Sequence, residues 1–331
     1  MDGIAQVQKA AGVPDLEPEA EPIRAVPVRH YGRWIGAVAA LLFVALIVRL
    51  FALSPNINWG TVRQYLGNGQ ILKGLQLTII YTLVSMALGV ALGIVVATMR
   101  LSVNPVLRAL SGVYIWIFRG VPLLVQIIFW FNIAIILPRV GIDIPGTHLG
   151  WSVYTSSIVT TSIAAVLALG LNEGAYMAEI VRAGIQVVDY GQTEAGLALG
   201  MKRSLLFRMI ILPQAMRAII PPTGNEFIGL LKSTSLVSVI AAQELLTKAQ
   251  IIYSRNLLII ELLLVASFWY ITVTTLLTWG QYYIERYYAR GSSNRQLPPT
   301  PMQRFRASLR RMYGRTETRE SDSQVEAGGA S

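Results

Sequence analysis

Six long apolar segments constrain this chain more than any other feature of its sequence. Each is close to the length of about 20 residues that a helix needs to cross a bilayer. They cover residues 34–53, 75–98, 121–137, 158–181, 223–246 and 257–284. Backbone polar groups in lipid must find their partners within the protein, so segments of this kind form helices. The sequence therefore predicts an all-α polytopic membrane protein with six transmembrane helices.

Composition supports the same fold class. Of the 331 residues, 53% are hydrophobic and 14% are charged, whereas about 25% of a soluble domain is charged. These values argue against a soluble enzyme and against a disordered scaffold. In the second apolar segment, Gly89 and Gly93 have the GxxxG spacing that lets a neighbouring helix approach closely.

The chain lacks the residues that several chemistries need. It has no Cys and only two His, so disulfides, thiolate nucleophiles and Cys-ligated metals are excluded. The nearest match to a phosphate-binding loop spans residues 224–233, but its Lys comes two positions late and it opens an apolar span. We therefore expect no ATPase site, no metal and no cofactor, and we do not expect an enzyme.

The distribution of Lys and Arg predicts the orientation. Cytoplasmic segments of membrane proteins are enriched in these residues. With the N-terminus inside, the inner segments hold 21 of the 28 Lys and Arg side chains and the outer segments hold six. We therefore expect both termini in the cytoplasm, and the net charge of +10 needs no nucleic acid to explain it.

The ends of the chain differ from its centre. Residues 1–33 are rich in Pro and acidic residues, and residues 291–331 are basic and then rich in Ser and acidic residues. Both read as disordered tails, and the second is expected to lie on anionic membrane lipid. Between them we expect one added transmembrane helix at 34–53 and a transmembrane domain at 72–286.

The long loop at residues 182–222 is amphipathic and prone to helix, unlike a passive linker. Thr193 is expected to cap a short helix that ends at Gly200, and a second helix is expected to end at Pro213. Two short helices across the membrane face would form a platform for a soluble partner.

This loop resembles the coupling signature of ABC transporter permeases. The matching residues are Glu194, Ala195, Gly196, Gly200, Ile210, Leu212 and Pro213. Gly196 stands where the family has a second Ala. Three further stretches, at residues 118–126, 174–185 and 231–236, make the chain similar to permeases for polar amino acids. The resemblance covers about residues 72–286.

The resemblance implies a membrane subunit of an importer in the bacterial plasma membrane. Its fold would be the five-helix core of type I permeases plus the added N-terminal helix. Two permease subunits would form the path, two cytoplasmic ATPase subunits would power it, and an extracytoplasmic binding protein would deliver a polar amino acid. In this family the small residues and Glu194 would lie where the ATPase docks.

Polar residues within the spans are candidates for the substrate path, because ionisable groups in a membrane are expensive. On an ideal helix, Asn225, Gly229, Lys232 and Gln243 share a stripe, with Ser235 at its edge. Lys232 could meet a substrate carboxylate or be a buried structural charge.

A second set lies on the fourth span, where Asn172, Tyr176 and Glu179 share a face. Glu179 could instead form an interfacial ion pair with Arg182, so Glu173 is the better candidate for a path-lining carboxylate. Arg119 and Pro122 open the third span and are explained by ordinary boundary preferences.

Two other classes of function stay open. One is a secondary transporter or channel that works without an ATPase, and the other is a membrane enzyme acting on lipid. The coupling loop argues against the first, and the scarcity of clustered His, Asp and Glu argues against the second. The sequence does not identify the amino acid, and it does not say whether the two permease subunits are identical.

Overall fold

The computed structural model describes residues 31–143 and 150–289, and the chain divides into two units, 1–57 and 58–331. In the first unit, helix α2 (Tyr31–Ala52) is apolar on all sides, and its side chains from Ile35 onward are exposed. A helix that is apolar all round is suited to lipid. The added helix expected at 34–53 is therefore present.

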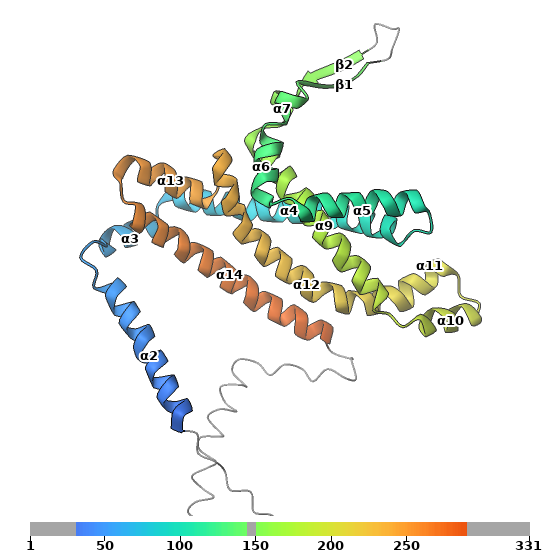
Figure 1. Ribbon diagram of the computed structural model, residues 1–331, viewed down its shortest axis with the longest axis horizontal. Coiled ribbons are helices and arrows are strands. Elements are labelled where there is room, and N and C mark those ends of the chain that lie inside the picture. Colours follow the sequence, from blue (N-terminus) through green and yellow to red (C-terminus); the bar gives the residue numbers. More distant parts are fainter. Residues whose placement is uncertain (1–30, 144–149, 290–331) are drawn as a thin grey trace, which may run out of the picture. The chain divides into compact units, whose positions relative to one another are not determined.

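The second unit is a bundle of helices with one β-hairpin (Figure 1). Its helices are α3 (Trp59–Leu66), α4 (Gly69–Leu101), α5 (Pro105–Gly120), α6 (Leu123–Phe131), α7 (Ile133–Ile136), α8 (Thr155–Ile158), α9 (Thr161–Gln186), α10 (Tyr190–Ala198), α11 (Arg203–Leu206), α12 (Leu212–Ser233), α13 (Leu245–Asn256) and α14 (Ile259–Ala289). A π-helix, η1 (Phe207–Ile211), precedes α12, and a 3-10 helix, η2 (Thr234–Ile240), follows it. Among the described residues, five helices are long and apolar enough to cross a membrane, or six if α5 and α6 together form one span.

Helices α4 and α9 form the centre of the second unit. A Cβ placed on Gly89 would lie 2.6 Å from Cγ of Glu173, and one placed on Gly93 would overlap the side chain of Met177. From the first contact to the second, the residue number rises by four on both helices, so α4 and α9 run parallel. Because glycine removes the side chain at these points, the backbones approach closely, as the GxxxG spacing predicts.

The third span differs from the prediction of one helix at 121–137. Helix α5 occupies a stretch that was expected to be a cytoplasmic loop, and α6 is bent from it by 102°. Pro122 has no N–H and disfavours helical geometry in the residue before it, and Val121 is accordingly extended. The side-chain amide of Gln126 donates to the carbonyls of Phe118 and Val121, at 2.9 and 2.8 Å, and so holds the bend.

The fifth span also departs from its predicted limits of 223–246. Helical structure begins at Arg203 and runs through Pro213 to Ile240, so the expected helix end at Pro213 is wrong. Ala241 then adopts a left-handed conformation (φ 56°) and stops the helix. Gln243 follows this stop, so it does not belong to the polar stripe predicted on one helix.

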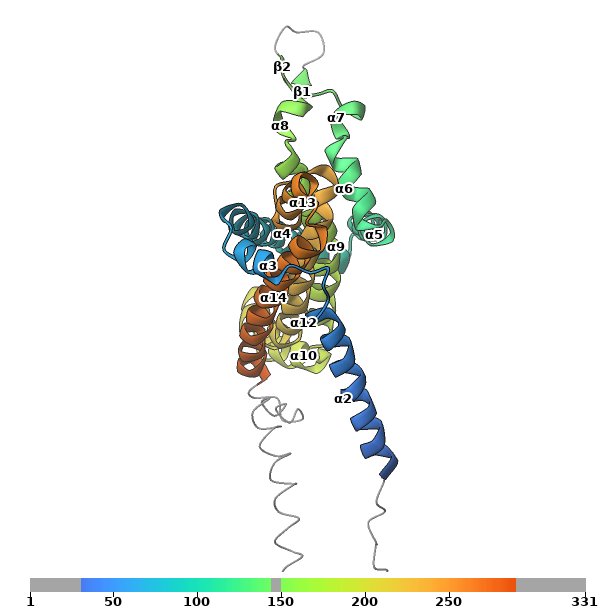
Figure 2. The same cartoon turned by 90° about the vertical axis from the view of Figure 1, so that its left-hand side faces the viewer.

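An antiparallel hairpin of β1 (Arg139–Asp143) and β2 (Gly150–Tyr154) was not expected from the sequence. It extends away from the helices of the second unit (Figure 1 and Figure 2). The Arg139 guanidinium lies 4.6 Å from the ring centre of Tyr154 and donates to its hydroxyl. The expected tails lie outside the described residues, apart from the start of α2.

Candidate functional site

The loop that carries the coupling signature folds into α10 and α11. Asp189, not Thr193, caps α10, and its carboxylate accepts from the backbone N–H of Gly191 at 2.8 Å. Gly200 follows the helix with φ of 75°, a left-handed conformation that glycine adopts without strain. The turn expected at Gly200 is thus present, two residues after the last residue of α10.

The signature residues divide between the surface and the interior. Glu194, Ala195 and Gly200 are exposed, whereas Gly196 is buried against the side chain of Leu206. Gly196 therefore brings α10 onto α11 and is not available to a partner, contrary to its expected docking role. The exposed residues leave one face of α10 open.

The second part of the signature leads into the membrane. Ile210 lies in the π-helix η1, and Leu212 and Pro213 begin α12. The side-chain amide of Gln214 donates to the carbonyl of Ile210 at 3.0 Å. The π-helix η1 and α12 thus form one continuous helical segment that starts in the loop.

A cavity of about 460 Å³ lies between the end of α5, the second half of α9 and α12. Its lining residues are Arg119, Tyr176, Glu179, Ile180, Ala183, Gly184, Val187, Ala218, Pro222 and Glu226. The Arg119 guanidinium lies 5.1 Å from the ring centre of Tyr176, within range of a cation–π contact. The lining therefore combines one guanidinium with two carboxylates.

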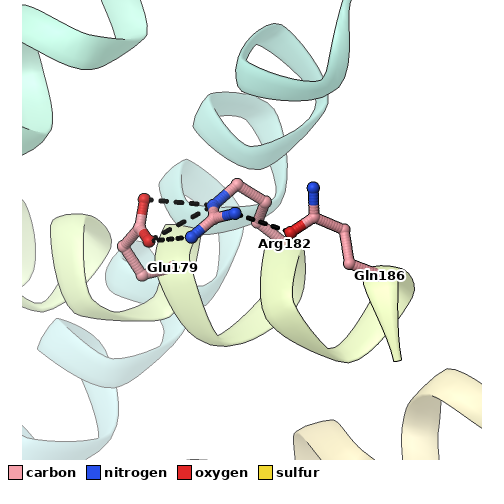
Figure 3. Close-up of polar contacts among 3 residues, drawn as sticks. All are labelled: Glu179, Arg182 and Gln186. Atoms are coloured by element: carbon pink, nitrogen blue, oxygen red, sulfur yellow. Dashed lines mark hydrogen bonds and ion pairs between the residues drawn. The ribbon is translucent and has the colours of Figure 1, made fainter.

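Glu179 forms an ion pair with Arg182 on the same helix (Figure 3). The guanidinium donates to Glu179 Oε2 at 2.5 Å and to Gln186 Oε1 at 2.6 Å. The ion pair considered from the sequence is present, and it is the one salt bridge found among the described residues. Glu226 has no such partner there, so it is the less compensated carboxylate of the cavity.

The other predicted path residues do not gather at this cavity. Glu173 is buried against α4, with Oε1 unpaired among the described residues. Asn172 donates to the carbonyl of Phe118 at 2.7 Å, and Asn225 accepts from the side-chain amide of Gln281 at 3.0 Å. Of this set, only Tyr176 reaches the cavity.

Lys232 lies at the other end of α12 and Ser235 lies in η2, and neither residue lines the cavity. Lys232 is exposed and forms no salt bridge with a described residue, so the reading as a buried structural charge is wrong. The Ser235 hydroxyl donates to the carbonyl of Lys232 at 2.8 Å.

Sequence reasoning missed Glu226 and gave Arg119 only a boundary role. Glu226 lies within the fifth apolar segment, so a count of acidic residues in the spans would have found it. No sequence pattern predicts that Arg119 and Glu226 line the same cavity, because the bend between α5 and α6 determines where Arg119 lies.

The chain matches a known family over residues 89–290, described as the binding-protein-dependent transport system inner membrane component. The chain belongs to this family. It is thus a multi-pass inner membrane protein, and it is the membrane component of a transport system rather than its catalytic subunit.

Individual relatives agree with this family. The arginine transport system permease protein ArgU of Corynebacterium glutamicum is 41% identical over 88% of this chain and 90% of its own length. The L-cystine transport system permease protein TcyB of Bacillus subtilis is 39% identical over 64% of this chain and 84% of its own. A crystal structure of an amino acid ABC transporter with histidines has a chain that is 32% identical, with a TM-score of 0.59, covering 70% of this chain and 99% of that one.

The ArgU match also includes part of the first unit. The first unit holds 57 of the 331 residues, about 17% of the chain, but the alignment with ArgU leaves only 12% of the chain unaligned. Even if every unaligned residue lay in the first unit, part of that unit would still be aligned with ArgU. The family model itself begins at residue 89. Similarity to ArgU therefore extends beyond the common core toward the added helix.

Proposed function

We propose that this chain is the permease subunit of an ABC importer for a cationic amino acid such as arginine. The charge pattern of the cavity is the observation that carries the proposal. Arg119 offers a site for the α-carboxylate, and Glu226 offers a site for an ammonium or guanidinium group. Glu179 is already paired with Arg182, so Glu226 is the carboxylate of the lining that is left for the cationic side chain of a ligand.

The helix backbone supports a cation at the same place. Ala218 and Pro222 both line the cavity, and Pro222 has no N–H to donate to the Ala218 carbonyl four residues earlier. That carbonyl can therefore accept from a bound ammonium group. The name of ArgU, which is similar over most of the chain, agrees with a cationic amino acid.

The proposal includes the partners that the family implies. Exposed Glu194 and Ala195 on α10 would contact one of two cytoplasmic ATPase subunits, and η1 would pass the motion to α12. A second permease subunit, identical or related, would complete the path, and an extracytoplasmic binding protein would deliver the solute. Both termini would be cytoplasmic. Lys232, exposed at the far end of α12, would face the path nearer the outer side.

The test is competition binding in lipid nanodiscs with the ATPase subunit co-expressed. We expect labelled arginine to be displaced by lysine at far lower concentrations than by glutamine. Glu226→Gln should weaken arginine binding about 10- to 100-fold, because a hydrogen bond to a charged group contributes about 1.5–3 kcal/mol.

Glu285→Gln is the matched control, since Glu285 lies on α14 outside the cavity. The side-chain oxygen of the new glutamine can still accept the hydrogen bond that Gln281 donates to Glu285. It should bind arginine as the wild type does. Equal displacement by glutamine and lysine in the wild type would refute the cationic class. Solute flux in liposomes without any ATPase would refute the ABC mechanism.

A further inference from the structure

The double proline of α12 leaves one turn of that helix with fewer hydrogen bonds of its own. Pro221 and Pro222 lie inside the helix, and neither has a backbone N–H to donate to the carbonyl four residues earlier. A helix bends most readily at such a place. The turn leads directly to Glu226, which lines the cavity together with Pro222. Helix α12 by itself therefore holds Glu226 less firmly, and a contact from another helix can fix its position.

Gln281 of α14 supplies hydrogen bonds to this turn. Its side-chain Nε2 donates to Asn225 Oδ1 at 3.0 Å and to the Pro221 carbonyl at 3.3 Å. Helices α12 and α14 lie side by side in Figure 1, and they are in close contact here. A Cβ placed on Gly224 would lie 2.9 Å from both Cγ and Cδ of Gln281. The absence of a side chain at Gly224 thus leaves the space that Gln281 occupies.

Glu285 holds the Gln281 amide in the orientation that these bonds need. It lies one turn further along α14, and its Oε1 accepts from the same Nε2 at 2.7 Å. A carboxylate and a backbone carbonyl only accept hydrogen bonds, so the amide has to turn its nitrogen toward both. That nitrogen carries two hydrogens. One hydrogen anchors Gln281 to its own helix, and the other reaches α12.

The bond to Asn225 determines which way Glu226 points. Successive residues of an α-helix project about 100° apart. When Asn225 is bonded to α14, the side chain of Glu226 therefore projects to a different side of α12, where the cavity lies. A rotation of this turn about the helix axis would break the bond between Asn225 and Gln281. It would also carry Glu226 away from its place in the cavity lining.

We infer that Gln281 is a positioning residue for the cavity, which fixes the α12 turn so that Glu226 faces the cationic group of the ligand. The inference rests on the proposed function, in which Glu226 binds that group. Gln281 itself does not line the cavity, so it acts through Glu226 and does not touch the solute. A polar contact that only joined two helices would stabilise the protein, but it would not favour arginine over a neutral amino acid.

The experiment is a double-mutant cycle on arginine binding, with the permease and its ATPase subunit in lipid nanodiscs. Gln281→Met keeps the approximate length of the side chain and removes its donor. We expect arginine binding to weaken about 5- to 10-fold, which is the effect of losing a typical hydrogen bond. Glutamine binding, measured by competition, should change by less than about 2-fold, because a neutral side chain does not need the charge of Glu226. In the Glu226→Gln background, Gln281→Met should also change arginine binding by less than about 2-fold, because residues that act as one unit are not additive.

Two glycines of α12 provide a second, matched test. Gly224→Ala forces the Gln281 side chain aside and leaves every polar group in place, and it should weaken arginine binding as Gln281→Met does. Gly229→Ala is the control, since a Cβ there meets nothing within 4 Å, and it should bind arginine as the wild type does. This pair tests the inference even if Gln281→Met does not fold.

Three results would overturn the inference. The first is unchanged arginine binding in Gln281→Met and in Gly224→Ala. The second is an equal loss from Gln281→Met with and without Glu226→Gln, and the third is an equal loss of arginine and glutamine binding. The second and third would make Gln281 only a link between two helices. A wild type that binds glutamine as tightly as arginine, or wild-type arginine binding in Glu226→Gln, would instead refute the proposed function and the inference with it.

Discussion

Replacing Gly93 with alanine tests how the interface between α4 and α9 is built. The new Cβ would overlap Met177 and lie 3.0 Å from the backbone nitrogen of Ala178. Backbone atoms cannot turn aside as a side chain can, so the two helices would have to move apart by roughly 1 Å. A gap of that size forfeits about a quarter to a half of the dispersion energy of the facing atoms.

The net cost follows from two opposing effects. Overpacking costs about 1–3 kcal/mol, whereas alanine is favoured over glycine in a helix by about 1 kcal/mol. We expect Gly93→Ala to destabilise the protein by up to about 2 kcal/mol. For a protein of this size the melting temperature should fall by up to about 8 °C, measured by thermal unfolding in detergent.

Gly280→Ala is the matched control for this substitution. Gly280 also lies within a long helix, α14, but a Cβ there meets nothing within 4 Å. Only the helix preference remains, so this variant should match or slightly exceed the wild type in melting temperature. If Gly93→Ala is as stable as Gly280→Ala, the close approach of α4 and α9 is wrong.

Two further substitutions test the bend and the loop. Gln126→Leu removes both hydrogen bonds that hold the bend. The Phe118 carbonyl keeps its bond from Asn172, but the Val121 carbonyl loses its side-chain donor, so a loss of about 1–2 kcal/mol is expected in thermal unfolding. An unchanged melting temperature would contradict this role. Gly200→Ala places a Cβ on a residue in the left-handed conformation, which costs about 1 kcal/mol of stability. The amount of ATPase that co-purifies with the variant should fall by a larger fraction than the amount of folded protein does. Full retention of the ATPase would show that the shape of this turn does not matter for docking.

Features that depend on local spacing could be predicted from the sequence. The spans at α2, α4, α9 and α14 follow from runs of apolar residues, which need no knowledge of the neighbours. Gly89 and Gly93 mark a close helix contact because their spacing places them on one face. Glu179 and Arg182 are three residues apart on one helix, so their ion pair is also a local feature.

Features that depend on packing could not be predicted. Glu173 and Glu226 both look like isolated carboxylates in apolar segments, yet the first is buried against α4 and the second lines the cavity. Pro213 would end an isolated helix, but the preceding π-helix and the packing of α12 carry the helix through it.

The bend in the third span connects the local and the distant features of this protein. Pro122 disfavours helical geometry at Val121, and Gln126 secures the resulting corner with two hydrogen bonds. Arg119 lies in the last turn before that corner and so reaches the ring of Tyr176. If residues 105–131 formed one straight helix, the chain after Gly120 would continue along the axis of α5. The bend next to the last turn of α5, which carries Arg119, would then be absent. The single guanidinium of the cavity, and the selectivity proposed for it, therefore depend on a bend between two helices at the position where the sequence predicted only the start of a span.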